Sequence, residues 1–240
     1  MNMLKSLRAA LGFLSIIPVG MDRVEDVARA SWTFPVVGAI IGVLASLIAF
    51  IFAYFFSWDI VALAALASLY IFSGFHHLDG LLDWADALFV RGSIEKKLGA
   101  MHDLNHGVSA FGTGFFVLLA GFLSIKHSSG LLIQLVVAES TAKFSMVLAC
   151  YISKGTSHRG TGTIFFSNIK GNRPLLFKTF LVYLPFLALA LFRAPYVLFD
   201  AAIITFLIVR NAEKSFGGIS GDILGAVNEI VRTATLMVLL

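Results

Sequence analysis

Seven stretches of the chain are strongly apolar and are separated by shorter polar connections. They are Thr33–Phe56, Ile60–Phe75, Phe111–Ile125, Leu131–Ile152, Leu175–Phe192, Tyr196–Val209 and a weaker stretch at Ala234–Leu240. A helix needs about 20 mostly apolar residues to cross the hydrocarbon core of a bilayer. The shorter stretches reach this length when their polar flanks extend the helices, and the last one then begins at about Asp222. The pattern predicts an all-α integral membrane protein with about seven transmembrane helices.

The segment before the first long stretch has a different character. Its apolar part, Leu11–Val19, is too short to span a bilayer, contains Pro18, and lacks the small-residue cleavage pattern of a signal peptide. We expect Met3–Val19 to form a helix along the membrane interface, with Lys5 and Arg8 at the level of the lipid headgroups.

Composition supports a membrane protein. The 240 residues are 58% apolar and 13% charged, whereas a soluble domain is about 45–50% apolar and about 25% charged. This length suits a single polytopic membrane domain over residues 1–240, with little room for a separate soluble domain. The one cysteine, Cys150, lies in an apolar stretch and is expected to be a small core residue.

The basic residues predict the orientation. All but three of the 18 Lys and Arg residues fall in one set of alternate connections; Lys126 and Arg193 fall in the opposite set, and Lys143 lies within a span. The positive-inside rule assigns the rich set to the cytoplasm. We therefore expect a multi-pass protein of the cell membrane. Because no basic block with interleaved aromatic residues accompanies the net charge of +4, nucleic-acid binding is not expected.

A cluster of acidic residues follows the second apolar stretch. Asp79, Asp83 and Asp86 are spaced at i, i+4 and i+7, so on a helix they share one face. Three neighbouring carboxylates repel one another unless a cation lies among them, and hard oxygen ligands suit Mg²⁺ or Mn²⁺. The alternative is a solvated acidic face neutralised by nearby basic residues. Carboxylates close to a membrane usually mark function, which favours the metal site.

Further polar residues flank this cluster. His76 and His77 precede it, and since neighbouring residues on a helix point in different directions, at most one of them points into the site. That histidine is either a general base, a phosphate contact or an interfacial polar residue. Asp103 belongs to the same cytoplasmic connection and is a candidate fourth carboxylate ligand.

A second polar cluster precedes the last apolar stretch and contains Gly217, Gly218, Ser220, Gly221, Asp222 and Glu229. A glycine-rich turn before a helix exposes backbone N–H groups that hold phosphate. Asp222 and Glu229 are seven residues apart and fall on one helical face. The alternative is an ordinary turn with a helix cap at Ser220 or Asp222. A third polar segment, Ser153–Arg173, is rich in Gly, Ser, Thr and basic residues and predicts an anion-binding loop.

Together these clusters resemble the cobalamin synthase family, adenosylcobinamide-GDP ribazoletransferase. That family has a histidine, one residue, Asp-Gly-Leu-Ala-Asp and a further aspartate, and His77–Asp86 follows this pattern. Its C-terminal Gly-Gly-x-Thr-Gly-Asp-x-Leu-Gly-Ala motif and following glutamate match Gly217–Ala226 and Glu229, with Ser220 in place of the threonine.

Two shorter motifs extend the resemblance over nearly the whole chain, in the expected order. The family's Met-x-Asp-x-x-x-Gly segment matches Met101, Asp103 and Gly107, and its Phe-Leu-x-x-Ile-Pro segment matches Phe13–Pro18. There are also departures. Lys143 stands where the family has an arginine, Ala87 follows Asp86 where the family has glycine, and Tyr151–Gly162 replaces an arginine-containing segment.

The resemblance implies an enzyme that transfers the cobinamide phosphoryl group of adenosylcobinamide-GDP to α-ribazole or its 5′-phosphate, with release of GMP. Mg²⁺ held by Asp79, Asp83 and Asp86 is expected to bridge the diphosphate, and a carboxylate or His77 to accept the hydroxyl proton. The residues expected to bind substrate are Asp103, Gly107, Lys143, Lys154, Arg159, Gly217, Gly218, Ser220, Gly221, Asp222 and Glu229. Membrane lipid is a further expected partner, and a homo-oligomer is compatible with the sequence.

Two other functions are consistent with part of the pattern. An ion-coupled transporter also uses acidic residues beside membrane helices, but its sites usually lie near the midplane between paired halves, which this chain lacks. A membrane CDP-alcohol phosphotransferase uses a similar aspartate-rich motif, although its full pattern is absent here. The released nucleotide, GMP or CMP, distinguishes the two enzymes.

Overall fold

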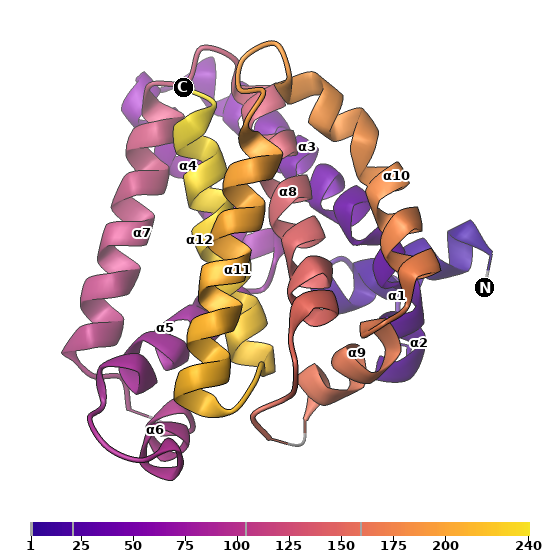
Figure 1. Cartoon of the computed structure of the whole chain (residues 1–240). Helices are drawn as coiled ribbons and strands as arrows, with labels where there is room; N and C mark the ends of the chain where they lie inside the picture. Colours follow the sequence, from indigo (N-terminus) through magenta and orange to yellow (C-terminus); the bar gives the residue numbers. More distant parts are fainter. Residues whose placement is uncertain (1, 21, 104, 159) are drawn as a thin grey trace.

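The computed structural model describes residues 2–20, 22–103, 105–158 and 160–240, which form a bundle of helices (Figure 1). The helices are α1 (Met3–Leu14), α2 (Val24–Ala30), α3 (Phe34–Ala53), α4 (Trp58–Phe72), α5 (His76–Phe89), α6 (Ile94–Met101), α7 (Val108–Lys126), α8 (Leu131–Ile152), α9 (Thr161–Ile169), α10 (Arg173–Ala190), α11 (Val197–Phe216) and α12 (Gly221–Val238). A single turn of 3₁₀ helix, Ser31–Thr33, joins α2 to α3.

Each of the seven apolar stretches forms a helix: α3, α4, α7, α8, α10, α11 and α12. Four helical segments are long and apolar enough to cross a membrane, namely 24–53, 108–126, 131–152 and 173–190. The bent pair α4 and α5 makes a fifth span if it is counted as one. The all-helical, multi-pass character is therefore confirmed, and the count of seven spans stays a prediction. The difference lies in three helices: α4, which is short, and α11 and α12, which carry several charged residues.

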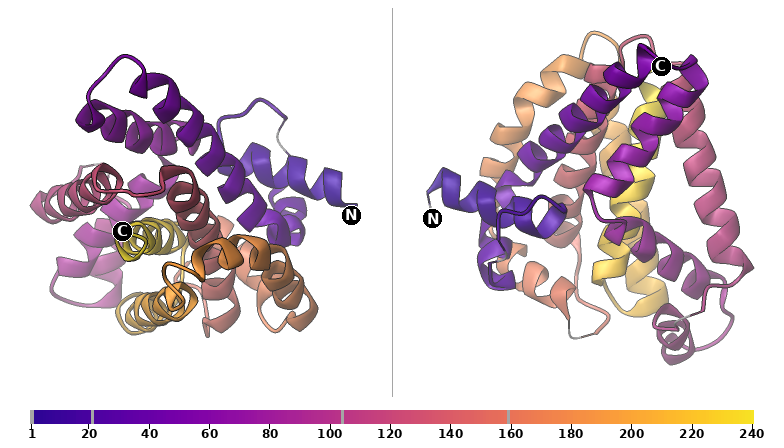
Figure 2. Two further views of the ribbon diagram at one scale, coloured as in Figure 1. Left: turned by 90° about the horizontal axis from the view of Figure 1, so that it is seen from above. Right: turned by 180° about the vertical axis from the view of Figure 1, so that it is seen from behind.

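Helix α8 lies at the centre of the bundle, as the view from above in Figure 2 shows. Of the most apolar 18-residue segment of α8, 78% is buried, whereas the corresponding share is 28% for α7 and for α10. Helix α3 approaches it closely through two glycines: a Cβ on Gly38 would lie 2.4 Å from the Glu139 carbonyl oxygen, and one on Gly42 would lie 2.7 Å from that of Leu135. Small residues at such contacts are typical of helix packing in membranes.

The N-terminal helix is shorter than expected. It begins after Asn2, whose side chain accepts a hydrogen bond from the Lys5 amide, and it ends at Leu14 rather than Val19. Beyond Ser15 the chain is extended, and the Ile16 amide donates to the Phe72 carbonyl. Pro18 lacks the N–H that a continued helix would need. In Figure 2, α1 lies at the edge of the bundle, and its place at a membrane interface stays a prediction.

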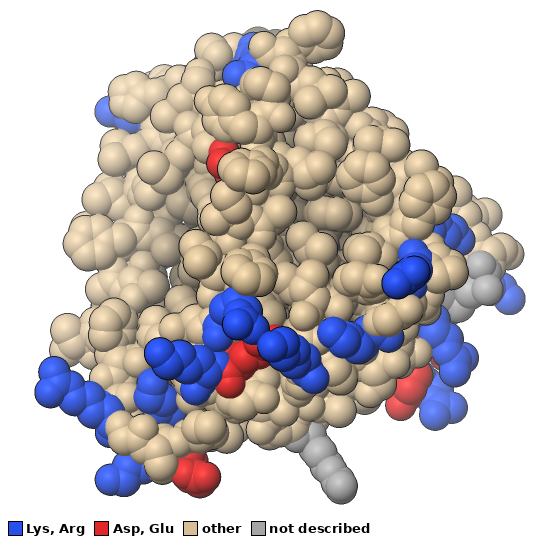
Figure 3. All heavy atoms as spheres, in the orientation of Figure 1, with Lys and Arg blue, Asp and Glu red and all other residues tan. Residues whose placement is uncertain are grey.

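The two ends of the bundle differ in charge. Basic side chains gather at the end that carries α5, α6 and α9, and few lie at the other end (Figure 3). The far end holds Lys126, which pairs with Asp59, and Arg193, which lies against Gly130. Large apolar side chains such as Phe50, Phe116 and Phe206 are exposed around the sides, as expected for a surface that faces lipid.

Candidate active site

A sharp bend between α4 and α5 creates the acidic site. The two helices are bent by 89° relative to each other. Gly74 and Phe75 both have positive φ, 66° and 61°, a conformation that is uncommon for a residue other than glycine. The bend ends α4 at Phe72 and turns α5 across the basic end of the bundle (Figure 1). The aspartates of α5 are thereby held at that end of the bundle.

Two glycines let α5 and α12 cross in close contact. A Cβ on Gly80 would lie 2.8 Å from the Asp222 Cα, and a Cβ on Gly225 would lie 2.9 Å from the His77 carbonyl oxygen. Only glycine fits at such separations between backbones. The crossing therefore joins the two polar clusters of the sequence, which are more than 130 residues apart, and brings Asp222 to the acidic face of α5.

The carboxylates at the crossing are crowded. The side chain of Asp83 is 19% exposed and that of Asp79 is 72% exposed. Burial, followed by the charges of Asp79 and Asp222, raises the pKa of Asp83 to about 6. Carboxylates destabilise one another in this way when no cation neutralises them. The arrangement is chemically suited to a divalent cation.

Three histidines lie around these carboxylates. His106 lies between Asp79 and Asp83, with Nε2 4.0 Å from Asp79 Oδ1 and Nδ1 3.7 Å from Asp83 Oδ1. His102 and His158 each have a ring nitrogen within 4.8 Å of an Asp222 carboxylate oxygen and of each other. Sequence reasoning missed all three. His102 and His106 lie in the segment Met101–Gly107, whose family motif includes Asp103 but neither histidine, and His158 lies in the loop that departs from the family pattern.

Asp86 makes different contacts from the other two aspartates of α5. Its Oδ1 accepts hydrogen bonds from the Ser109 hydroxyl at 2.6 Å and the Ala110 amide at 2.9 Å, and its Oδ2 accepts one from the Gly107 amide at 2.5 Å. These donors belong to the first turn of α7 and to the residue before it, where amides lack partners within the helix. Asp86 therefore fixes the start of α7 to α5. Its expected role as a metal ligand stays a prediction.

The glycine-rich turn before α12 is built as a helix cap. Ser220 Oγ accepts a hydrogen bond from the Ile223 amide and donates one to Asp222 Oδ2, both at 3.2 Å. The cap at Ser220, one of the two interpretations of this segment, is thus confirmed. The cap also orients the Asp222 carboxylate at the start of the helix.

The loop that follows α8 is hydrogen-bonded to the glycine-rich turn before α12. The Ile219 amide donates to the Gly155 carbonyl, and the Ser157 amide donates to the Ile219 carbonyl, each at 3.0 Å. Gly218, with φ of +156°, has no room for a side chain, because a Cβ would lie 2.4 Å from the Gly155 carbonyl. These contacts fix the loop against the turn and place His158 beside Asp222.

Comparison with known proteins identifies the family. A family model described as cobalamin-5-phosphate synthase matches residues 6–240. The chain belongs to this family. It is 35% identical over 236 residues to a Pyrococcus abyssi protein named adenosylcobinamide-GDP ribazoletransferase, with 97% of each chain covered. The chain is also similar to two proteins of the same name. The one from Thermococcus kodakarensis is 35% identical, with 97% of each chain covered. The one from Methanosarcina barkeri is 30% identical, with 98% of this chain and 91% of that protein covered. No solved structure matches the chain.

Two residues that were expected to bind substrate, from the resemblance to cobalamin synthases, lie inside the core. Lys143 of α8 and Glu229 of α12 are both fully buried. Lys143 Nζ lies 3.2 Å from Glu139 Oε2 and donates to Asn228 Oδ1 at 2.7 Å. Arg232 pairs with Glu229 and, at 3.2 Å, with Glu139. The seven-residue spacing places Glu229 two turns along α12 from Asp222, inside the bundle.

The remaining expected residues are spread around the site. Asp103 is exposed and accepts two hydrogen bonds from Asn105, and Gly107 lies against Asp86. The backbone amide of Lys154 donates a hydrogen bond to Glu213, and the Lys154 side chain is exposed at the basic end of the bundle. Arg159 lies outside the described residues. The substrate roles of these residues in this cobalamin-5-phosphate synthase family member stay predictions.

Proposed function

We propose that the protein transfers the cobinamide phosphoryl group of adenosylcobinamide-GDP to α-ribazole or its 5′-phosphate. The observation that carries the proposal is the crossing at Gly80 and Gly225, which joins the two family motifs at one cluster of carboxylates. The names of the full-length relatives supply the substrates. A ribose hydroxyl oxygen forms a bond to the phosphorus that carries cobinamide. The bond from that phosphorus to GMP breaks, and GMP leaves with the bonding electrons.

The carboxylates at the crossing are suited to hold Mg²⁺. We propose Asp79, Asp83 and Asp222 as its ligands, because these three lie at the crossing while Asp86 is engaged by three donors of the α7 end. A bound Mg²⁺ would neutralise charge on the diphosphate and on the departing GMP. A carboxylate of the cluster accepts the proton of the attacking hydroxyl. Asp86 acts on this site indirectly, by holding the loop that carries His106.

The site is proposed to face the cytoplasm, in a protein with seven spans. The gathering of Lys and Arg at the end that carries the acidic cluster supports this orientation (Figure 3). It also attracts anionic substrates, because clustered positive charge raises their local concentration. Lys154 and Arg173 belong to this basic surface.

The first experiment measures nucleotide release by the purified protein in liposomes. With Mg²⁺, adenosylcobinamide-GDP and α-ribazole 5′-phosphate, we expect GMP and a cobalamin product in equal amounts, and no release in EDTA. Asp83→Asn should lower the rate by more than about 100-fold, because losing a ligand exceeds the 10–100-fold effect of outer-shell changes. The matched control is Asp59→Asn, whose carboxylate pairs with Lys126 at the far end. Release of CMP from a CDP-alcohol by folded protein, with no GMP from adenosylcobinamide-GDP, would replace this proposal with the rival enzyme.

A further inference from the structure

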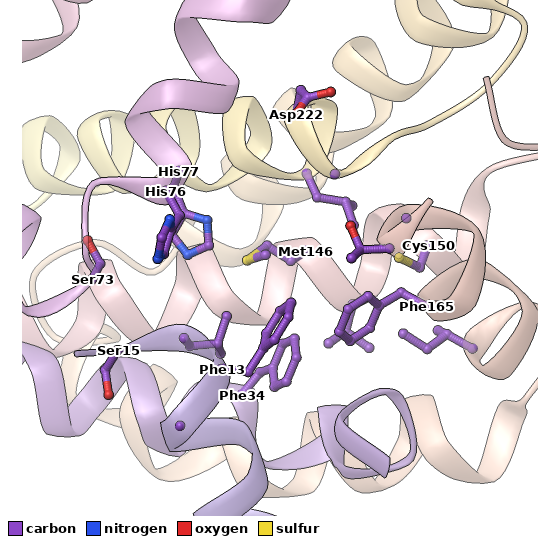
Figure 4. Close-up of a pocket in the computed structure, with 18 of the residues that line it drawn as sticks. Phe13, Ser15, Phe34, Ser73, His76, His77, Met146, Cys150, Phe165 and Asp222 are labelled. Carbon is purple, nitrogen blue, oxygen red and sulfur yellow. The ribbon is translucent and has the colours of Figure 1, made fainter. Parts of the chain in front are cut away.

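An apolar cavity lies beside the acidic cluster. It has a volume of about 490 Å³ and is enclosed by residues of α1, α3, α5, α8, α9 and α12. Its walls include Phe13, Phe34, Met146, Cys150 and Phe165 (Figure 4). The Phe165 ring centroid lies 5.3 Å from that of Phe13 and 5.8 Å from that of Phe34, so the three rings form one continuous aromatic wall.

The cavity borders the α5–α12 crossing at which the proposed metal site lies. Asp222, which lies at the α5–α12 crossing, also lines the cavity. His76 and His77, at the start of α5, line the same cavity, and Figure 4 shows their imidazole rings projecting toward Met146 and Phe13. A molecule in this cavity therefore has one end among the phenylalanines and the other at the start of α12, whose Asp222 carboxylate points to the far side of the helix (Figure 4).

One polar atom near the cavity lacks a partner. His77 is 8% exposed, and its Nε2 has no hydrogen bond within the described part of the chain. A buried polar atom without a partner is costly, so a ligand that supplies one is favoured. This nitrogen lies beneath a boundary that is mainly apolar and carries a few polar side chains such as Ser73 and Thr161, which predicts a ligand that is largely apolar and offers a small number of hydrogen-bonding atoms.

We propose that this cavity binds the planar aromatic base of the acceptor nucleoside, with the attached ribose at Asp222 and its hydroxyl group at the metal site. This inference rests on the proposed function. A benzimidazole base is flat, mostly apolar and has one unsubstituted ring nitrogen. Its faces stack against the aromatic wall, and its ring nitrogen is available to the imidazole of His77.

The other parts of the two substrates fit the cavity poorly. A guanine base carries donors and acceptors around its edge, which the apolar walls would leave unpaired. The corrin ring system is far larger than a bicyclic base and carries polar amide side chains. A lipid acyl chain suits the walls but offers nothing to His77 or Asp222. The acceptor base alone satisfies both ends of the cavity.

The test fills the cavity and compares the two substrates. Cys150 is small, 1% exposed and part of the cavity wall, so Cys150→Phe projects a ring into the space. We expect the KM for α-ribazole 5′-phosphate to rise at least tenfold, with the KM for adenosylcobinamide-GDP unchanged. The matched control is Ala67→Phe, which adds the same ring type to an apolar groove of about 450 Å³ between α3 and α4. This control should leave both KM values unchanged.

A second measurement uses the unaltered protein and separates the inference from the proposed function. Binding of α-ribazole and of ribose 5-phosphate is measured by calorimetry in lipid nanodiscs, and free benzimidazole is added as a competitor. We expect α-ribazole to bind at least tenfold more tightly than ribose 5-phosphate and to be displaced by benzimidazole. Equal binding of the two, or a Cys150→Phe protein that folds and keeps its acceptor KM, overturns the inference while GMP release still supports the enzyme. Absence of GMP release with tight, displaceable α-ribazole binding refutes the enzyme and supports the cavity.

Discussion

Replacing Gly80 with alanine tests the idea that the helix crossing builds the site. The new Cβ would lie 2.8 Å from Cα and 2.9 Å from the carbonyl oxygen of Asp222. Carbon atoms in contact prefer a separation of about 3.5–4.0 Å, so α5 and α12 must part by roughly 0.7–1.2 Å. Both obstacles are backbone atoms, and no side-chain rotation relieves the clash. The substitution therefore shifts Asp222 relative to Asp79 and Asp83.

The effect on turnover should exceed the effect on stability. Overpacking of this size costs about 1–3 kcal/mol, which leaves most membrane proteins folded. A misplacement of about 1 Å in a reacting assembly lowers its rate by about 100-fold. We expect kcat for GMP release to fall about 100-fold, and the Mg²⁺ concentration needed for half-maximal rate to rise, because the carboxylates no longer converge.

The assay is GMP release over a Mg²⁺ titration, with folding followed by thermal unfolding in the same detergent. Gly112→Ala is the matched control: Gly112 lies within α7, and a Cβ there meets nothing within 4 Å. A folded Gly80→Ala protein with the normal kcat and Mg²⁺ dependence would refute the idea that close helix contact positions the carboxylates.

Two further predictions concern individual carboxylates. Asp83 has a pKa of about 6 and must lose its proton to bind a cation. The affinity for Mn²⁺, measured by electron paramagnetic resonance, should therefore fall about tenfold for each pH unit below 6. An affinity that does not change with pH would contradict the role of Asp83 as a ligand. Asp86→Asn should lower the free energy of unfolding by about 1–3 kcal/mol, because one of the two carboxylate oxygens that accept hydrogen bonds from the start of α7 becomes a donor. Its Mn²⁺ affinity should stay within a few-fold of normal, whereas a collapse in affinity with unchanged stability would support Asp86 as a metal ligand.

The apolar pattern predicted the helices well because spanning helices must satisfy every backbone hydrogen bond internally. It predicted their ends less well where local geometry intervenes. The stretch Ile60–Phe75 was expected as one helix, but positive φ angles at Gly74 and Phe75 end α4 at Phe72. Nothing in the hydropathy of these residues signals a bend of 89°. That bend decides whether the acidic residues lie inside a span or across the end of the bundle.

The acidic site was predicted in part. Periodicity correctly placed Asp79, Asp83 and Asp86 on one helix, but it treats all carboxylates alike. The partners that distinguish them come from distant segments: His106 approaches Asp79 and Asp83, while the start of α7 engages Asp86. Such contacts depend on how loops fold back, which spacing along one helix does not encode. The glycines after Asp79 and Leu224 were visible signals of the crossing, because each removes a Cβ between two backbones.

The buried charges of α8 and α12 show a further limit of the sequence pattern. Lys143 and Glu229 were expected to bind substrate because they stand at motif positions of the cobalamin synthase family. In the structure, Glu139, Lys143, Glu229 and Arg232 form a set with two negative and two positive charges, all fully buried. The guanidinium of Arg232 also lies 4.3 Å from the ring centroid of Tyr70. The Arg232–Glu139 pair and the hydrogen bond from Lys143 to Asn228 connect α8 to α12, which carries Asp222. They therefore help to hold one wall of the site in place.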